Sequence, residues 1–161
     1  MIVKGSCHCG KVKFQLRSAT PYPYMRCYCS ICRKTAGGGG YAINIMGDAA
    51  TLKVRGEKNI SIYRARLKHG KASRLSSARR HFCASCGSAL WAWSPQWPQW
   101  VYPFASAIDT PLPGPPQIQH IMLDHAAPWV EVPKGKANPH FREYPNEAII
   151  DWHKKRGLLQ P

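Results

Sequence analysis

Short runs of alternating polar and apolar residues dominate the first three quarters of the chain. The segment 11–16 reads Lys-Val-Lys-Phe-Gln-Leu, so every second side chain is apolar, which is the period of a half-buried β-strand. Glycine and proline separate the runs at intervals typical of strands joined by turns. The pattern predicts a mainly β fold of antiparallel sheets, with strands at 11–16, 41–46, 60–63, 81–83, 89–91, 101–104 and 118–122.

Two segments are expected to be short helices. The first begins near Ser30, a residue type that caps helix N-termini well, and ends at the glycines 37–40. The second covers 146–156 and stops at Gly157, with acidic residues early and basic residues late, as the helix dipole favours. The length fits one core, and the chain shows no repeat and no convincing domain boundary, so we expect a single domain over 1–161.

The chain carries no sign of membrane insertion or export. No stretch approaches the roughly 20 apolar residues of a membrane-spanning helix. Residues 1–7 lack the apolar core of a signal peptide. We therefore expect no membrane partner and a cytoplasmic, reducing location, where disulfides are rare.

The net charge of +15 is unevenly distributed. Residues 1–108 contain 17 lysines and arginines but only two acids, Asp48 and Glu57, whereas 109–161 contain six residues of each sign. One acid-free stretch, 64–80, holds seven basic residues: Arg64, Arg66, Lys68, Lys71, Arg74, Arg79 and Arg80. The positive electrostatic field of these residues attracts anions, so the partner could be a small anionic molecule or nucleic acid. The alternative is a basic surface or hairpin that is simply solvated and binds no partner.

The seven cysteines form three tight clusters. Their spacings are C-x-C, C-x-C-x-x-C and C-x-x-C, from Cys7 and Cys9, then Cys27, Cys29 and Cys32, then Cys83 and Cys86. In a reducing compartment such clusters favour metal over a disulfide framework, which would also leave one thiol unpaired. A structural zinc takes four protein ligands and a catalytic zinc three, and four plus three accounts for all seven.

The outer two clusters suit a closed site. Alternate residues of a strand point to one side, so Cys7 and Cys9 can reach the same ion. The C-x-x-C turn from Cys83 to Cys86 places two sulfurs likewise, and Gly87 permits the tight backbone. Together the pairs would pin the N-terminal region to the middle of the chain.

The middle cluster suits an open site. Cys27, Cys29 and Cys32 arise from six consecutive residues, at the start of the first expected helix, where backbone N–H groups stabilise thiolates. A zinc held by these three would keep a position for water or a substrate thiolate. A remote histidine as fourth ligand is the alternative, and spacing alone also leaves open other pairings, such as the first four cysteines on one ion.

Four ordered motifs together resemble the glutathione-dependent formaldehyde-activating enzyme family, which includes centromere protein V. The resemblance covers about 3–132 and leaves 133–161 as a C-terminal extension. The motifs are Gly-Ser-Cys-His-Cys-Gly at 5–10, Cys-Tyr-Cys-Ser-Ile-Cys-Arg-Lys at 27–34, Phe-Cys-Ala-Ser-Cys-Gly at 82–87, and His-Ile at 120–121 followed by Ala-Pro-Trp at 127–129.

The resemblance implies a zinc-bound antiparallel β fold of the β-tent kind with two zinc ions per chain. It implies a structural zinc on Cys7, Cys9, Cys83 and Cys86. It implies a second zinc, in the substrate cleft, on Cys27, Cys29 and Cys32. The activity it implies is condensation of formaldehyde with the thiol of glutathione to S-hydroxymethylglutathione, formally a carbon–sulfur lyase reaction in reverse.

Two positions depart from the pattern of the family's named enzyme. Tyr28 and Arg33 stand where that enzyme has Gly and Trp. Shared fold and metal do not by themselves fix a substrate. The alternative is a non-enzymatic module that uses zinc as a scaffold and its basic face to bind nucleic acid or an acidic partner.

Aromatic and histidine side chains offer further candidates. Four tryptophans lie within 91–100, where they either wall a pocket or pack in the core. His120 and His125 are expected to be structural, with a base or ligand role as the alternative.

Overall fold

The computed structural model describes residues 1–69 and 72–161, and within these ranges it contains thirteen strands and two α-helices. The strands are β1 (Ile2–Ser6), β2 (Lys13–Arg17), β3 (Met25–Cys27), β4 (Ala42–Ile43), β5 (Gly47–Asp48), β6 (Lys53–Arg55), β7 (Ile60–Tyr63), β8 (Arg66–His69), β9 (Ala72–Leu75), β10 (Arg79–Cys83), β11 (Ala89–Trp93), β12 (Trp100–Pro103) and β13 (Gln119–Ile121). The helices are α1 (Ser30–Ala36) and α2 (Ile149–Lys155).

Two antiparallel sheets enclose the main core. One has the order β1-β2-β6 and the other the order β5-β12-β11-β10-β7. The alternation seen in the sequence becomes a buried face: Val3 of β1 and Leu16 of β2 are almost fully buried, while their neighbours in the chain point outward. Phe14 meets Trp91 of the larger sheet edge-on at 5.3 Å between ring centroids, which joins the two sheets.

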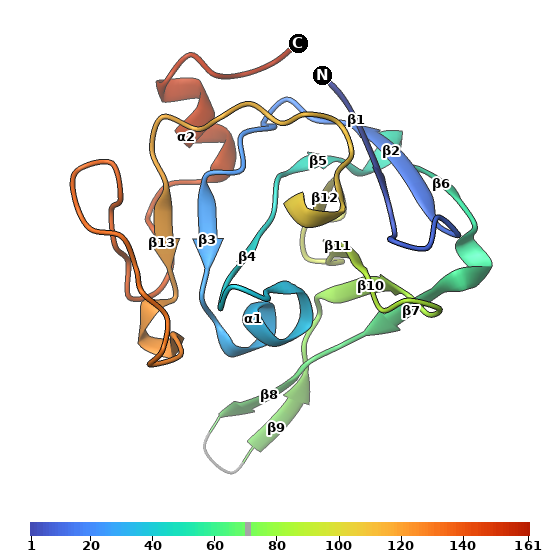
Figure 1. The fold of residues 1–161 in the computed structure, drawn as a ribbon, viewed down its shortest axis with the longest axis horizontal. Helices are drawn as coiled ribbons and strands as arrows, with labels where there is room; N and C mark the ends of the chain where they lie inside the picture. The colour runs from blue at the N-terminus through green and yellow to red at the C-terminus, as the bar shows by residue number, and fades with distance from the viewer. Residues whose placement is uncertain (70–71) are drawn as a thin grey trace.

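A third sheet, β13-β3-β4, supports the middle cysteine cluster. Its β13–β3 pair is parallel, with Ile121 opposite Cys27, whereas β3–β4 is antiparallel. Around it lies a second apolar cluster that includes Cys27, Cys32 and Phe104. Figure 1 shows α1 between this sheet and the β10–β7 side of the larger one.

The C-terminal helix closes the molecule near its N-terminus. Trp152 of α2 is fully buried and stacks on Tyr24, with ring centroids 3.7 Å apart. The N-terminal ammonium of Met1 donates a hydrogen bond to the carbonyl oxygen of Pro161 at 2.9 Å. The two chain ends therefore lie side by side (Figure 1).

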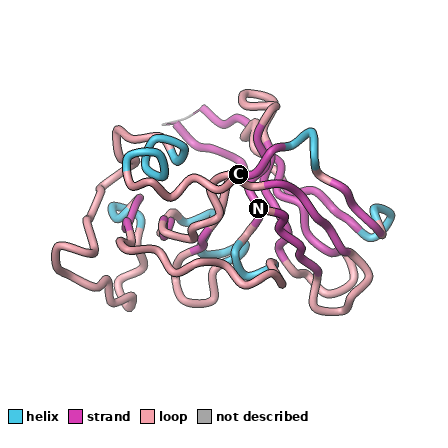
Figure 2. Tube along the Cα trace, turned by 90° about the horizontal axis from the view of Figure 1, so that it is seen from above, coloured by secondary structure: helices cyan, strands magenta, loops and turns pink. Residues whose placement is uncertain are grey.

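The hairpin of β8 and β9 projects away from the rest of the structure (Figure 1). Seen from above, the longer strands lie together on one side, and much of the irregular chain lies on the other (Figure 2). Neither helix of the described chain has the length and apolar character needed to cross a bilayer.

The predicted mainly β, antiparallel architecture with two short helices is confirmed. The prediction of one strand over 41–46 is wrong. Only Ala42–Ile43 pairs with β3, and the chain then crosses to the larger sheet, where Gly47 pairs with Val101. Ile45 and Met46 are adjacent and both buried, since this segment passes between two sheets and does not keep one face toward solvent.

Both helices differ from prediction at their N-termini. Cys29, not Ser30, caps α1, because the Cys29 sulfur accepts the backbone N–H of Cys32. Helix α2 begins at Ile149 instead of 146. Glu147 precedes it and pairs with Lys155 at 2.9 Å, so this acid binds the last turn rather than forming the first.

Candidate metal centres

The structure gathers the seven sulfurs into two groups. Within each group the sulfurs lie within 4.8 Å of one another. All seven cysteines fall in the described ranges, and none forms a disulfide. The outer group consists of Cys7, Cys9, Cys83 and Cys86, and the middle group of Cys27, Cys29 and Cys32.

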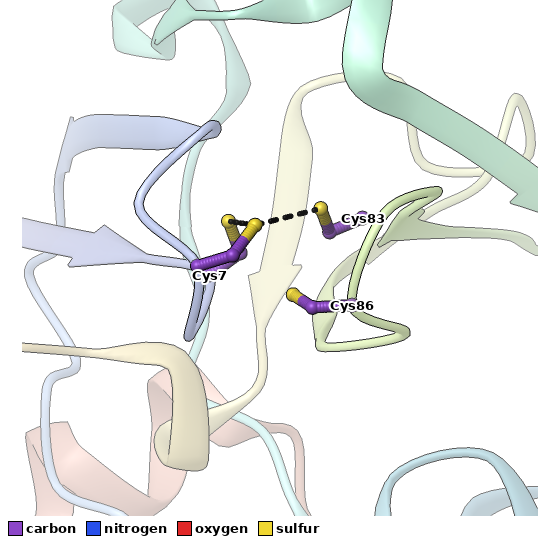
Figure 3. A group of neighbouring side chains, drawn as sticks. Cys7, Cys83 and Cys86 are labelled. Atoms are coloured by element: carbon purple, nitrogen blue, oxygen red, sulfur yellow. Dashed lines mark hydrogen bonds between the residues drawn. The ribbon is translucent and has the colours of Figure 1, made fainter.

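The geometry of the outer group fits a tetrahedral metal. The sulfurs of Cys7 and Cys9 are 3.5 Å apart, and those of Cys9 and Cys83 are 3.8 Å apart. Four thiolates around a zinc, with bonds of about 2.3 Å, would lie about 3.8 Å from one another. Figure 3 shows Cys83 and Cys86 facing Cys7 from a separate segment of the chain. The donor set and spacing therefore match a closed Cys₄ site.

Two similar turns create this arrangement. Gly10 follows Cys9 and Gly87 follows Cys86, and both have positive φ, 74° and 73°. A residue with a side chain adopts that conformation only at a cost. Each glycine donates its N–H to the carbonyl of the first cysteine of its pair, Gly10 to Cys7 at 2.9 Å and Gly87 to Cys83 at 2.8 Å. The turns thereby present their sulfurs to one another.

The middle group is built where β3 passes into α1. Cys27 ends β3, Cys29 caps the helix, and Cys32 lies in its first turn. The backbone N–H of Cys32 donates to the Cys29 sulfur at 3.3 Å. Cys27 and Cys32 are buried and Cys29 is half-buried. Cap geometry alone thus brings three sulfurs from six residues to one place.

Because the three sulfurs are packed closely together, their pKa values shift in opposite directions. A hydrogen bond from Cys27, and then one from Cys32, lower the pKa of Cys29 to about 2. The same bond raises the pKa of Cys27, and burial adds to this shift. Without metal the group therefore carries one thiolate, on Cys29. A divalent metal ion bound there would favour the thiolate form of all three sulfurs and offset two of their three negative charges.

No histidine, acid or further cysteine joins the middle group among the side chains that the structure describes. His120, one of the candidates, is fully buried elsewhere in the same sheet. Its Nδ1 lies 2.8 Å from the Tyr28 hydroxyl and its Nε2 lies 3.2 Å from Asn138 Oδ1. Both ring nitrogens are engaged, so His120 has a structural place. His125 is exposed and lies 3.4 Å from Glu143.

Arg80 stands directly beside the middle group. Its Nη2 lies 3.9 Å from the sulfur of Cys32. Arg80 lies near the start of the strand that Cys83 ends, so β10 contributes to both cysteine groups. In the sequence, Arg80 is one of seven basic residues in 64–80 and nothing singles it out. Its position beside a cysteine group results from strand pairing, which cannot be read from the sequence.

A cavity of about 320 Å³ borders the middle group. It shares Ala89 and Phe104 with the apolar cluster around Cys27 and Cys32. Its principal lining residues are Thr35, Tyr63, Arg80, His81, Phe82 and Phe104. A slightly larger cavity of about 370 Å³ lies near the C-terminus, with Arg17, Asp48 and Trp100 in its lining, and neither cavity is lined by a cysteine. The smaller cavity is connected to the middle group through Arg80, which lines the cavity and adjoins the Cys32 sulfur.

The other sequence candidates separate in space. Trp91 is buried in the main core and Trp97 is 53% exposed, so the four tryptophans form no common wall beside the cysteines. The basic stretch 64–80 is likewise divided. Arg79 lies over the ring of Trp93 while Arg80 turns toward Cys32, and Lys71 falls outside the described residues.

Tyr144 is a residue at this site that the sequence gave no reason to select. Partial desolvation of its phenol, followed by the nearby negative charge of the middle cysteine group, raises its pKa to about 12, while the residue as a whole stays 67% exposed. It therefore stays protonated at neutral pH. Phe141, from the same segment, packs against the middle cluster and donates its N–H to the His120 carbonyl. No motif marks this segment.

A mainly β chain with a four-sulfur and a three-sulfur group belongs to the class of small cysteine-rich domains able to bind metal. Comparison with known proteins gives the family. The model of the glutathione-dependent formaldehyde-activating enzyme family matches residues 2–124, and the chain belongs to this family.

Two relatives extend the comparison. A curated Halomonas elongata protein, named provisionally as a glutathione-dependent formaldehyde-activating enzyme, is 52% identical over 158 residues, 98% of each chain. A crystal structure of a Rhodobacter sphaeroides protein, a structural genomics target, is 27% identical with a TM-score of 0.51 over 68% of this chain and 91% of that one.

Proposed function

We propose that this chain catalyses the condensation of formaldehyde with glutathione to S-hydroxymethylglutathione, and the reverse carbon–sulfur cleavage, in the cytoplasm. The observation that carries the proposal is the three-sulfur group, which has no fourth protein ligand among the described side chains and adjoins Arg80, a residue that lines a cavity. The family and the name of the Halomonas elongata relative support it.

The proposal assigns one zinc ion to each cysteine group. The closed outer group would hold a structural zinc, because four thiolates leave no position for a substrate. The middle group would hold a second zinc through Cys27, Cys29 and Cys32. When bound there, zinc supplies positive charge that favours the thiolate form of a thiol.

The reaction balances without an added oxidant or reductant. The glutathione sulfur forms a bond to the formaldehyde carbon, and the thiol proton ends on the former carbonyl oxygen as the new hydroxyl. The protein side of the site is electropositive, since Arg80 adjoins Cys32 and every ion pair of the described chain lies in 109–161. An electropositive site favours the thiolate that attacks.

Exchange measurements test this reaction. The rate of interconversion between formaldehyde and S-hydroxymethylglutathione is measured by NMR at equilibrium, with both metal sites filled. We expect wild-type protein to exceed the spontaneous rate and Cys29→Ser to lose that excess. A fully loaded wild type that only matches buffer would refute the proposed reaction.

A binding module for nucleic acid is tested beside it. Such a module would be retained on heparin or DNA in a salt-sensitive way, and Cys29→Ser would not alter the retention. The comparisons provide no support for it, and the two arginines at the end of the basic stretch do not form one surface, since Arg79 lies over the Trp93 ring while Arg80 lies beside Cys32.

A further inference from the structure

Arg80 carries donors that the protein does not use. Its Nε and Nη1 atoms are buried, and neither has a hydrogen-bond partner among the described residues. Only Nη2 has a neighbour of this kind, the Cys32 sulfur at 3.9 Å. A guanidinium has five N–H donors, and leaving buried donors unpaired is unfavourable. Arg80 is therefore arranged for a partner that is not part of this chain.

Arg26 and Arg33 each also have a buried Nε atom without a partner in the described chain, but Arg80 has two such atoms and is the one of the three that lines the cavity. Arg142 pairs with Asp124 at 2.9 Å and Arg156 with Glu147 at 3.6 Å. Arg79, next to Arg80 in the strand, is exposed and lies over the Trp93 ring. Arg80 has neither an acid nor an aromatic face in the described chain, and it lines the cavity beside the middle cysteines.

The cavity has the size and polarity of a small-molecule site. Its volume of about 320 Å³ is at the lower end of the range for such sites. Phe82, Ala89 and Phe104 supply apolar walls, and Arg80 is the one lysine or arginine in its lining. His81 also lines it, and the buried Nδ1 of His81 is a second polar atom without a partner in the described chain.

We propose that Arg80 binds a carboxylate of the thiol substrate, so that recognition and chemistry occur side by side in this cavity. The inference rests on the proposed function, because it takes glutathione as the thiol. A guanidinium binds a carboxylate through two parallel N–H···O bonds, which neither lysine nor a neutral amide reproduces. Since Nη2 adjoins Cys32, the bound carboxylate would lie close to the three sulfurs.

Binding of an unreactive analogue tests the proposal without any turnover. The ligands are S-methylglutathione and its dimethyl ester, and their dissociation constants are measured by calorimetry on the metal-loaded protein. We expect the wild type to bind the acid about 10- to 100-fold more tightly than the ester. In Arg80→Gln this preference should fall to about threefold or less, because the forked donor is lost while the cavity remains.

Arg79→Gln is the matched control. It removes the same charge from the adjacent residue, so it reports the effect of the general positive field, and we expect it to keep the wild-type preference. Metal content and the unfolding midpoint are measured for each variant. Where Arg80→Gln does not fold, Arg80→Lys decides: it should weaken binding of the acid at least about threefold and leave the ester unchanged.

Three outcomes would overturn the inference: no binding of S-methylglutathione to wild type, no acid preference in wild type, or an unchanged preference in the folded Arg80 variants. Its failure differs from that of the proposed reaction. A chain that binds the acid through Arg80 but gives no rate above buffer keeps the recognition site and loses the reaction. If an Arg80 variant still accelerates the reaction and binds the acid as tightly as wild type, the proposed reaction stands and the role of Arg80 in recognition fails.

Discussion

Tyr28 shows how a residue between two cysteines can serve the site without touching substrate. It is fully buried between Cys27 and Cys29, and its hydroxyl lies 2.8 Å from His120 Nδ1. The Asn138 amide nitrogen donates to the Lys134 carbonyl, so its oxygen accepts from His120 Nε2–H. Nδ1 is then the acceptor, and Tyr28 donates. The loop of the middle group is thus fixed to β13.

Replacing Tyr28 by phenylalanine should destabilise the protein. The change leaves a buried acceptor on His120 unpaired, which costs about 1–3 kcal/mol in the free energy of unfolding. Denaturant titration measures it. Tyr41→Phe is the control, because Tyr41 packs on Tyr28 but its hydroxyl has no hydrogen-bond partner in the described chain, and we expect a change within about 0.5 kcal/mol. Equal effects for both variants would contradict the assigned hydrogen bond.

The unequal pKa values within the middle group predict how many protons a metal displaces. Cys29 is a thiolate at pH 7 because its pKa is lowered to about 2, whereas the pKa of Cys27 is raised, and so is that of Cys32. Metal loading should therefore release two protons, not three. As pH falls, protons compete for the two thiols, so apparent zinc affinity should drop about 100-fold per pH unit.

Calorimetry in buffers of different ionisation enthalpy measures this release, with the outer group already loaded. Release of three protons at pH 7 would show that the sulfurs titrate independently and that Cys29 is not pre-ionised. Affinity that does not change with pH would exclude thiolate ligation by this group.

At the scale of elements, α2 is a larger part of the fold than its position suggests. It lies beyond residue 124, where the family match ends, yet its Trp152 is completely buried against Tyr24. Trp152→Ala should lower the free energy of unfolding by about 3–5 kcal/mol, as for other buried aromatic residues. Trp97→Ala is the comparison, because Trp97 is 53% exposed and we expect a change within about 0.5 kcal/mol. Denaturant titration of both variants decides.

The sequence predicted elements whose signal is local. The period-2 run around Phe14 became β2, and Ile60–Tyr63 matched its predicted bounds, because a half-buried strand shows its two faces directly. The segment 41–46 failed because its apolar side chains face two sheets, which removes the alternation. The strand Ile2–Ser6 went unpredicted since Gly5 and Ser6 interrupt its apolar pattern.

The site could be predicted only as far as spacing reaches. C-x-C and C-x-x-C turns place sulfurs through local backbone geometry, so the two groups of cysteines were expected. Arg80 reaches Cys32 across 48 residues, and Tyr144 comes from an irregular segment after the last motif. Such placements depend on how sheets pair and pack, and single-sequence patterns do not contain that information.

At the scale of the whole molecule, the two cysteine groups should differ in what their loss removes. The outer group joins the β1–β2 turn to the β10–β11 turn, whereas the middle group lies within one segment. We expect two zinc ions in wild type and one in Cys29→Ser, which should remain folded. Cys9→Ser should lose most of its cooperative unfolding, since a structural zinc can contribute on the order of 10 kcal/mol.

Metal analysis and thermal unfolding measure both variants under the same conditions. Chelation of wild type should follow the same order, with the middle ion leaving before the fold is lost. A Cys29→Ser protein that unfolds more readily than Cys9→Ser would reverse the assignment of the structural site.

Strand β10 has a consequence for the binding equilibria of the molecule. It runs from Arg79 to Cys83, five residues, with Arg80 in the lining of the cavity and Cys83 in the outer group. A carboxylate held by Arg80 and a metal held by Cys83 would each fix the same short strand. If fixing the strand at one site favours binding at the other, reciprocity requires each ligand to strengthen the other by the same factor. The zinc that never meets the substrate would still help to set how tightly the substrate binds.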